Sequence, residues 1–365
     1  MELTILAERW EPERGGRERL LHALAGRAAA KGIGVRVLCR RGDDGRDGVS
    51  VAHVSAPRFP RSLGEALFQR RAAALAASAK GPVLAGRPMR AATHAQLHDG
   101  LLSEAFEAER DAMQGPRRAL QPLGNRLNAR RHVLLAEEER MLSGPEPPRL
   151  MVFSHALAER LRQRYPGRDV TLATPGVDRS VFTPGAPPVP RPNLQLAFVG
   201  NDFALKGLAT ALQALRLSVE AGRDVRLTVA GTGPPRFATL ARRLGLSDRV
   251  VFAGRLAPQE TAALFRRSDA LLYPTFRDTF GLVIAEALAS GCPVITTSRS
   301  GAAERLEDGV NGYVVPDPRD AAAFARAIAA VADAGPRLRA GAARLGATFD
   351  ARAHEEEVLA WLGLS

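Results

Sequence analysis

The chain has 365 residues, a length that predicts two globular domains with ample buried core. Its 45% hydrophobic and 25% charged residues exclude a disordered chain, and two cysteines are too few for a disulfide framework. The net charge of +12 permits nucleic acid, an anionic membrane or an acidic substrate as a partner, without choosing among them.

Short apolar runs alternate with helical patterns through the first half of the chain. A strand is predicted at residues 3–8, followed by a glycine pair and a helix over 17–31. Further predicted strands occupy residues 35–39, 49–54, 82–86 and 151–154. The Arg- and Glu-rich stretch from Asp99 to Met141 is predicted to be helical.

The alternation becomes more regular after a proline-rich segment. FTPGAPPVPRPN, at residues 182–193, carries five prolines and is the expected interdomain linker. Strands are then predicted at residues 194–200, 225–231, 250–254, 270–275 and 293–297. The expected fold class is α/β, with two Rossmann-like doubly wound domains facing a central cleft. We predict domains at 1–183 and 184–348, and a last helix, 349–365, that packs back on the first domain.

Three loops that follow predicted strands have anion-binding features. Gly15 and Gly16 precede a helix, where backbone amides favour an anion, although a glycine pair alone is a weak signal. Lys206 is one of three lysines among 51 basic residues and stands at the start of a helix, where its charge opposes the helix dipole. A bound phosphate would reverse that cost, so the position favours a phosphate ligand.

The segment YPTFRDTFGLVIAEALASGCPVI carries the strongest signal. Asp278 lies in its loop, and a helix is expected to start near Phe280 or Gly281, so the amides of its first turn are available to an anion. Glu286 follows Asp278 by eight residues, a little over two helical turns, among apolar neighbours. Together these residues are suited to a phosphate and to sugar hydroxyls. By contrast, GTGPPRF has Arg236 where a dinucleotide fingerprint needs its third glycine, so a nicotinamide cofactor is not expected.

The motifs, in this order, resemble the family 4 retaining glycosyltransferases, which have the GT-B fold. GGRERLLHALAGRAAAKGIGVRVLC, VFSHALAERLRQRYP, TPGVDRSVF, VGNDFALKG, VAGTGP and DTFGLVIAEALASGCPVITT are similar to the family's motifs. GNDFALKG, PPRF and RPMRAATHAQLHDGLL look most like the lipopolysaccharide-core heptose α-glucosyltransferases. The chain departs from the family pattern at Asp278, where a glutamate is usual, and at Asn201 and Leu205, where a basic residue is often found.

The resemblance implies roles for individual residues. Asp99, Lys206, Asp278 and Glu286 would be catalytic, with Lys206 neutralising a diphosphate, Glu286 holding ribose hydroxyls and Asp278 contacting the sugar. The implied donor-binding residues are Gly15, Gly16, Asn201, Lys206, Arg255, Asp278, Phe280, Gly281, Leu282, Val283 and Glu286. His94 and His98 are acceptor-side candidates. No metal-binding residues and no cofactor are expected, because the chain has no Asp-x-Asp signature.

The implied activity is transfer of a hexose, most simply glucose from UDP-glucose, to a glycolipid, lipopolysaccharide-core or related saccharide acceptor. A GDP-mannose-dependent mannosyltransferase and a non-catalytic nucleotide-sugar-binding protein remain alternatives. Glu2 and Glu8 interrupt any signal-peptide pattern, and no apolar run approaches the roughly 18 residues that span a bilayer, so we expect a cytoplasmic location.

The charge distribution bears on the partners. The first 188 residues hold 30 basic and 21 acidic residues, and the remainder holds 21 and 18, so the net charges are +9 and +3. Aromatic residues are only 5% and the basic residues alternate with glutamates, which argues against nucleic acid. The basic first half instead favours peripheral contact with an anionic membrane.

Overall fold

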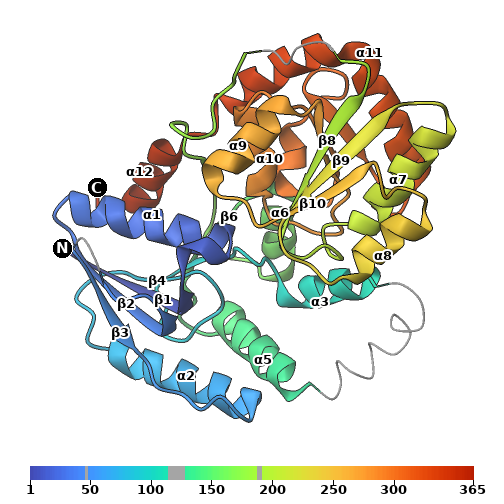
Figure 1. Cartoon of the computed structure of the whole chain (residues 1–365). Coiled ribbons are helices and arrows are strands. Elements are labelled where there is room, and N and C mark those ends of the chain that lie inside the picture. Colours follow the sequence, from blue (N-terminus) through green and yellow to red (C-terminus); the bar gives the residue numbers. More distant parts are fainter. Residues whose placement is uncertain (46–47, 114–127, 187–190) are drawn as a thin grey trace. The chain divides into compact units, whose positions relative to one another are not determined.

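The computed structural model describes residues 1–45, 48–113, 128–186 and 191–365, drawn in Figure 1. The chain divides into two units, one of Met1–Arg110, Gln114–Thr174 and Arg352–Ser365 and one of Asp111–Met113 and Pro175–Ala351. The main division falls after Thr174, whereas the sequence placed it after residue 183. Residues 175–183 go with the second unit because Val177 pairs with Asp350 of that unit. Residues 352–365, at the end of the chain, belong to the first unit.

A seven-stranded parallel sheet forms the first unit, in the order β3-β2-β1-β4-β5-β6-β7. Its strands are β1 (Glu2–Trp10), β2 (Gly34–Gly42), β3 (Val49–His53), β4 (Val83–Ala85), β5 (His94–Gln96), β6 (Arg149–Val152) and β7 (Val170–Leu172). Residues 3–7 of β1 are all buried, because helices cover both faces of the sheet.

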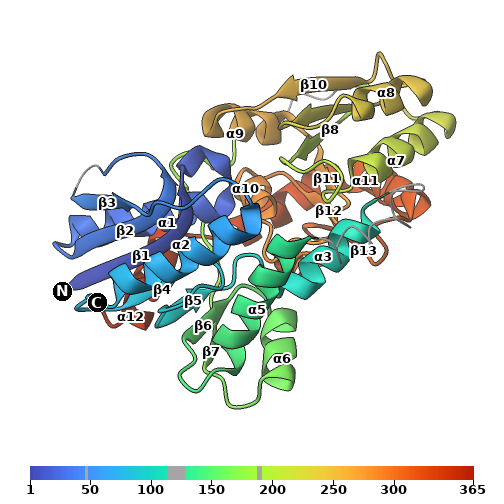
Figure 2. The same ribbon diagram turned by 90° about the horizontal axis from the view of Figure 1, so that it is seen from below.

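The helices of this unit are α1 (Gly16–Ala30), α2 (Arg61–Ala76), α3 (Leu102–Asp111), α5 (Ala129–Ser143), α6 (His155–Arg164) and α12 (Ala351–Trp361). Figure 1 shows α1 and α12 on one side of the sheet and α2 and α5 on the other. Arg27 of α1 pairs with Glu356 of α12 at 2.7 Å. Phe68 and Ala72 of α2 pack on Leu6 and Leu38 of the sheet. In Figure 2, α5 and α6 lie beside β6 and β7, where they share an apolar cluster.

The second unit is a six-stranded parallel sheet in the order β10-β9-β8-β11-β12-β13. Its strands are β8 (Leu194–Val199), β9 (Val225–Ala230), β10 (Val250–Gly254), β11 (Ala270–Tyr273), β12 (Val294–Thr297) and β13 (Gly312–Val315). Its helices are α7 (Leu208–Glu220), α8 (Arg236–Arg243), α9 (Pro258–Arg267), α10 (Leu282–Ala289) and α11 (Ala321–Gly346). One apolar cluster joins α7, α8 and α11 to one face of the sheet.

Two doubly wound parallel sheets confirm the expected Rossmann-like α/β class. In each sheet the strand order reverses at the first strand, because β1 lies between β2 and β4 and β8 lies between β9 and β11. Ligands of such sheets bind beyond the carboxyl ends of the strands at these reversal points. The loops after β1, β4, β8 and β11 are therefore the places where a site is expected.

Candidate functional site

The loops after β8 and β11 are joined at the reversal point of the second unit. The backbone N–H of Phe276 donates to the carbonyl of Leu205 at 2.8 Å. Gly207 has a φ of +78°, and a Cβ placed there would lie 1.9 Å from the carbonyl oxygen of Pro274. A side chain at position 207 would therefore push the loops apart. This close approach brings Lys206 and Asp278, which are 72 residues apart in sequence, into contact.

Lys206 and Asp278 form an ion pair with a distance of 2.7 Å between Nζ and Oδ2. The same Oδ2 accepts a hydrogen bond of 2.8 Å from the Tyr273 hydroxyl, and Nζ also donates to the carbonyl of Arg277 at 3.3 Å. The two charged side chains are only 18% and 19% exposed. Sequence reasoning selected both partners and missed Tyr273, which ends the buried strand and looks from its neighbours like a core residue.

The contacts around Asp278 fix the protonation states of Asp278 and Tyr273. Burial raises the pKa of Asp278, but the Lys206 charge and the hydrogen bonds from Lys206 and Tyr273 outweigh it, so the pKa lies below its usual value. Burial, followed by the Asp278 charge, raises the pKa of Tyr273 well above its usual value. Asp278 is therefore ionised at neutral pH, and Tyr273 remains a hydrogen-bond donor.

Helix α10 begins beside this pair. Gly281 caps it with a φ of +90°, and a Cβ there would lie 2.6 Å from the Ser300 hydroxyl, which fits glycine. The first amides of an α-helix have no partner within the helix, so those of Leu282 and Val283 are available to an anion. Glu286 lies one further turn along and is only 5% exposed. Phe280 is also buried, and its ring packs against Phe349 with centroids 5.9 Å apart.

Other candidates of the second unit lie in loops at the same edge of the sheet. Asn201 is exposed after β8, and Arg255 is exposed after β10, the edge strand two places away. The glycines of GTGPPRF have a packing explanation. A Cβ at Gly231 would lie 1.9 Å from the Gly200 carbonyl oxygen, and one at Gly233 would lie 2.0 Å from the Phe203 ring. That GxG therefore lets two loops approach each other.

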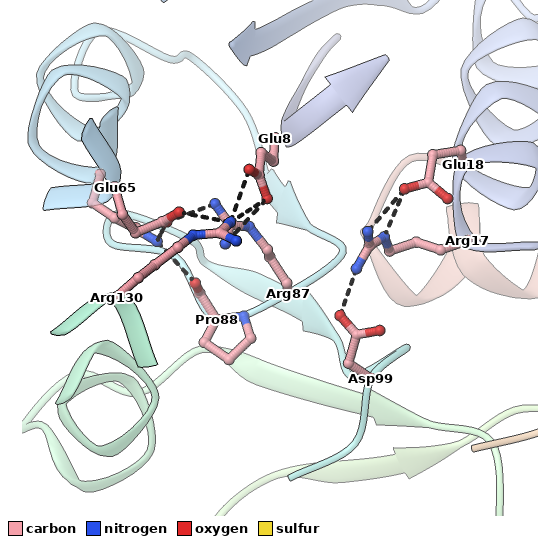
Figure 3. A network of polar contacts seen from close by, with 9 residues as sticks. Glu8, Arg17, Glu18, Glu65, Arg87, Pro88, Asp99 and Arg130 are labelled. Carbon is pink, nitrogen blue, oxygen red and sulfur yellow. Dashed lines mark hydrogen bonds and ion pairs between the residues drawn. The ribbon is translucent and has the colours of Figure 1, made fainter. Parts of the chain in front are cut away.

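The first unit places Asp99 beside the glycine pair. Gly15 caps α1 and Gly16 begins it, and the next residue, Arg17, donates from Nη1 to Asp99 Oδ2 at 2.5 Å and from Nη2 to Glu18 Oε1 at 2.8 Å (Figure 3). Burial lowers the pKa of Arg17, but the Asp99 and Glu18 charges raise it further, so the net shift is upward. The sequence predicted Asp99 and the glycines here, while Arg17 and Glu18 were missed among many exposed charges.

The two histidine candidates lie at opposite ends of strand β5. His98 follows the end of β5, its Nε2 lies 3.0 Å from Gln96 Oε1, and its ring packs on Phe153. Burial lowers its pKa well below the usual value, so His98 is neutral. His94 begins β5, and its ring edge meets Trp361 with centroids 4.7 Å apart. Of the two, only His98 therefore lies at the carboxyl end of the strands, where a ligand would bind.

A second charged cluster occupies the reversal point between β1 and β4. Glu65 is fully buried on α2 and accepts from Arg87 at 2.8 Å and from Arg130 at 3.3 Å, and Arg130 also donates to Glu8 at 2.9 Å. Figure 3 shows these side chains turned toward one another. Burial raises the pKa of Glu8, but Arg87 and Arg130 lower it further, so Glu8 is ionised. No local sequence pattern predicts this cluster, because its members come from β1, α2, α5 and the loop after β4.

Among the described residues, no group of three or more His, Cys, Asp or Glu side chains is arranged to hold a metal ion. Across the same residues, every helix is too short or too polar to cross a lipid bilayer.

Comparison with solved structures identifies the fold. The fold matches that of WaaG, a glycosyltransferase involved in lipopolysaccharide biosynthesis, with a TM-score of 0.82, 20% identity and 99% of both chains covered. It also matches Anabaena Alr3699/HepE in complex with UDP and glucose, with a TM-score of 0.72, 18% identity and 99% of both chains covered. The two units thus have the GT-B glycosyltransferase fold.

Sequence comparison adds a family match within the second unit. Residues 193–334 match the family described as Glycosyl transferases group 1. The chain is also similar to the D-inositol 3-phosphate glycosyltransferase of Mycobacterium sp. (strain JLS), 32% identical over 253 residues, which are 60% of this chain and 56% of the relative. The chain spans about half the length of the curated relatives it matches.

Proposed function

We propose that this protein is a retaining, metal-independent glycosyltransferase that moves glucose from UDP-glucose to a saccharide acceptor of the glycolipid or lipopolysaccharide-core type. The observation that carries the proposal is the Lys206–Asp278–Tyr273 cluster beside the first turn of α10. The group 1 match over residues 193–334 supports transfer of a sugar. The complex of Anabaena Alr3699/HepE with UDP and glucose and the role of WaaG support the finer choice of donor and acceptor.

The proposed chemistry depends on stabilising the leaving nucleoside diphosphate. Negative charge grows on the diphosphate as the bond to the sugar breaks, and fixed positive groups lower the energy of that state. Lys206 supplies an ammonium held in place by Asp278, and the amides of Gly281, Leu282 and Val283 supply dipoles at the start of α10. Glu286 would accept hydrogen bonds from the ribose, with Asn201 and Arg255 beside the nucleotide and Phe280 contributing its backbone.

On the acceptor side we propose the Arg17–Asp99 pair of the first unit. Asp99 would accept a hydrogen bond from the acceptor hydroxyl, and the hydrogen bond from Arg17 orients that carboxylate. Gly15 and Gly16 leave the backbone at the start of α1 open to the donor's phosphate and sugar. His98 is neutral and lies one residue before Asp99, so we propose it as an acceptor-side contact and assign no such role to His94.

The test of the donor site is Lys206→Ala. Loss of the ammonium should reduce kcat for release of UDP from UDP-glucose by about 10²–10³, the range found when one charge-stabilising group is removed. The matched control is Arg216→Ala on α7, whose guanidinium is half exposed and pairs only locally with Glu220. Near-normal turnover in Lys206→Ala, or an equal loss in the control, would contradict the proposed site.

Two other activities are tested by one substrate panel. The similarity to the D-inositol 3-phosphate glycosyltransferase favours a phosphorylated polyol as a second candidate acceptor. The panel should therefore combine UDP-glucose and GDP-mannose with a lipopolysaccharide-core saccharide and inositol 3-phosphate, before and after treatment with a chelator. Turnover with GDP-mannose alone would indicate a mannosyltransferase, and binding without turnover on any pair would indicate a non-catalytic protein. Loss of activity after chelation would contradict the metal-independent reaction.

We also propose a cytoplasmic location with peripheral contact to an anionic membrane. The support is the net charge of +9 in the first 188 residues and an acceptor carried by a lipid.

A further inference from the structure

A cavity of about 870 Å³ lies at the amino edge of the second sheet, and we call it the amino-edge cavity. Residues at the starts of four strands line it: Leu194 begins β8, Val225 begins β9, Asp269 precedes β11 and Gly291 precedes β12. The loops that carry Lys206 lie at the opposite, carboxyl edge. Helix α10 runs from one edge to the other, and its eight residues span about 12 Å, so the cavity is separate from the proposed donor site.

Helix α11 forms another wall of the cavity. Two rows of its residues, each spaced by four positions and therefore on one face of the helix, are Ala332, Pro336 and Ala340, and Gly335, Arg339 and Ala343. All of them except the arginine are small or cyclic, so they leave the space beside the helix open. Leu194, Val225 and Val331 add apolar surface. A mostly apolar cavity of this volume, with a few polar groups, is typical of a site for a small organic molecule.

Three arginines reach the cavity from separate elements. Arg339 comes from α11, Arg191 from the segment before β8, and Arg223 from the turn between α7 and β9. The Arg339 guanidinium is fixed at the end of α9, where it donates to the carbonyls of Ser268 at 2.7 Å and Arg266 at 2.8 Å. The protein thus holds one cation firmly in the wall of the cavity.

Arg191 has a hydrogen-bond donor that the protein does not use. Its Nη2 donates to Asp269 Oδ2 at 2.8 Å. Its Nε is buried and, within the part of the chain that the structure describes, has no hydrogen-bond partner. A buried donor without an acceptor is unfavourable, so an anionic group bound beside Arg191 would supply what the donor lacks.

The lining carries an excess of positive charge. Its three arginines stand against two carboxylates, those of Asp224 and Asp269, which leaves a net charge of +1. Asp224 already accepts a hydrogen bond of 2.6 Å from Arg249, which lies outside the lining. A ligand with a single negative charge therefore suits the cavity, and arginine binds carboxylates especially well through its paired N–H groups.

We propose that the amino-edge cavity binds an organic monocarboxylate with an apolar body, at a site separate from that of the nucleotide sugar. The carboxylate binds Arg191 and Arg223, and the apolar body packs on Leu194, Val225 and the small residues of α11. A nucleotide fits this cavity poorly, because it carries several negative charges and the walls are mostly apolar.

The first test is calorimetric titration of the full chain with 4-phenylbutyrate and with octanoate. Both should bind saturably, at one site per chain. The neutral 4-phenylbutyramide should bind about tenfold more weakly or worse, because it lacks the charge that the arginines recognise. Acetate should not reach saturation, because it lacks the apolar body. The affinity for 4-phenylbutyrate should be the same in the presence of UDP.

Two variants locate the ligand in the cavity. Ala340→Trp fills the space from the exposed side of α11 and should abolish binding, whereas Ala322→Trp, at an exposed position of the same helix outside the lining, should bind normally. Arg223→Gln should weaken binding by about tenfold, and Arg326→Gln, which removes an exposed charge of α11, should not. The Tm of each variant without ligand checks that it is folded.

Four results would overturn the proposal. They are failure of both carboxylates to bind saturably, equal affinity for the amide, undiminished binding in Ala340→Trp, and displacement of the carboxylate by UDP. The titrations need no acceptor and no turnover, so their outcome is independent of the proposed transferase activity.

Discussion

At the scale of single residues, the Asp278 carboxylate is the most informative group. The family that the sequence resembles usually has a glutamate here. From the sequence, the aspartate therefore reaches one methylene less far toward the sugar. The structure shows that the shorter side chain is held on one oxygen by Lys206 and Tyr273 together. The aspartate thereby sets the position of the ammonium that we propose to meet the diphosphate.

Replacing Asp278 by Asn should separate binding from turnover. The variant removes the negative charge that partly offsets Lys206, so UDP should bind as tightly as before or more tightly. Turnover of UDP-glucose should fall, because the ammonium loses its anchor and the sugar loses a proposed contact. Calorimetric titration with UDP and measurement of kcat would check the two effects, with Asp224→Asn, a half-exposed carboxylate after α7, as the control. Parallel losses of UDP binding and turnover would contradict this role.

At the scale of elements, ring contacts and ion pairs hold α12 against the first unit. Phe153 contacts both His98 and His354, and Arg27 and Lys31 of the α1 end bind Glu356. His354 is 5% exposed, and burial lowers its pKa to about 4. Its neutral imidazole is therefore part of what keeps the last helix on the unit that contains the start of the chain.

This burial predicts sensitivity to acid. The pKa of His354 is about 4 in the folded protein and about 6.5 when unfolded, so the unfolded state binds more protons between these values. The contribution of His354 to the free energy of unfolding is complete above pH 6.5. It is lost as the pH falls toward 4, by about 3 kcal/mol. His354→Leu should flatten that dependence in urea unfolding, whereas exposed His155→Leu should not.

Tryptophan fluorescence can follow the unfolding of the first unit separately from that of the second. The chain contains two tryptophans, Trp10 in β1 and Trp361 in α12, and both lie in the first unit. A pH dependence equally steep in His354→Leu and in the wild type would show that other groups control acid unfolding.

At the scale of the whole molecule, nucleotide binding should stabilise the second unit selectively. A ligand at a hundred times its Kd adds about 2.7 kcal/mol to the free energy of unfolding. For a unit of this size that corresponds to a rise in Tm of roughly 5–10 °C. We expect the rise with UDP, smaller shifts with GDP and ADP, and none with UDP in Lys206→Ala. Calorimetry of the full chain would resolve the two units, and a shift with GDP alone would move the proposed donor to GDP-mannose.

The fold class and the donor-side motifs could be read from the sequence because each depends on local patterns. Alternating apolar runs and helical stretches predict two doubly wound domains, and strands β1, β2 and β8 to β12, which begin or end in clear apolar runs, lie where expected. Strands β5, β7 and β13 have three or four residues of mixed composition, so no pattern marks them. The predicted helical stretch from Asp99 to Met141 contains α3 and most of α5, and its residues 114–127 lie outside the described part of the chain, as do linker residues 187–190.

The sequence by itself determined the class of fold, the loops that carry Lys206 and Asp278 and the helix that carries Glu286, because strand ends, helix starts and rare residues are local features. Only the tertiary structure decided which groups meet. It paired Lys206 with Asp278 across 72 residues, brought Arg17 to Asp99, assembled the Glu65 cluster from four elements, and set His94 apart from His98. The physical reason is that a parallel sheet orders its strands differently from the chain, so contacts across its carboxyl edge cannot be counted along the sequence.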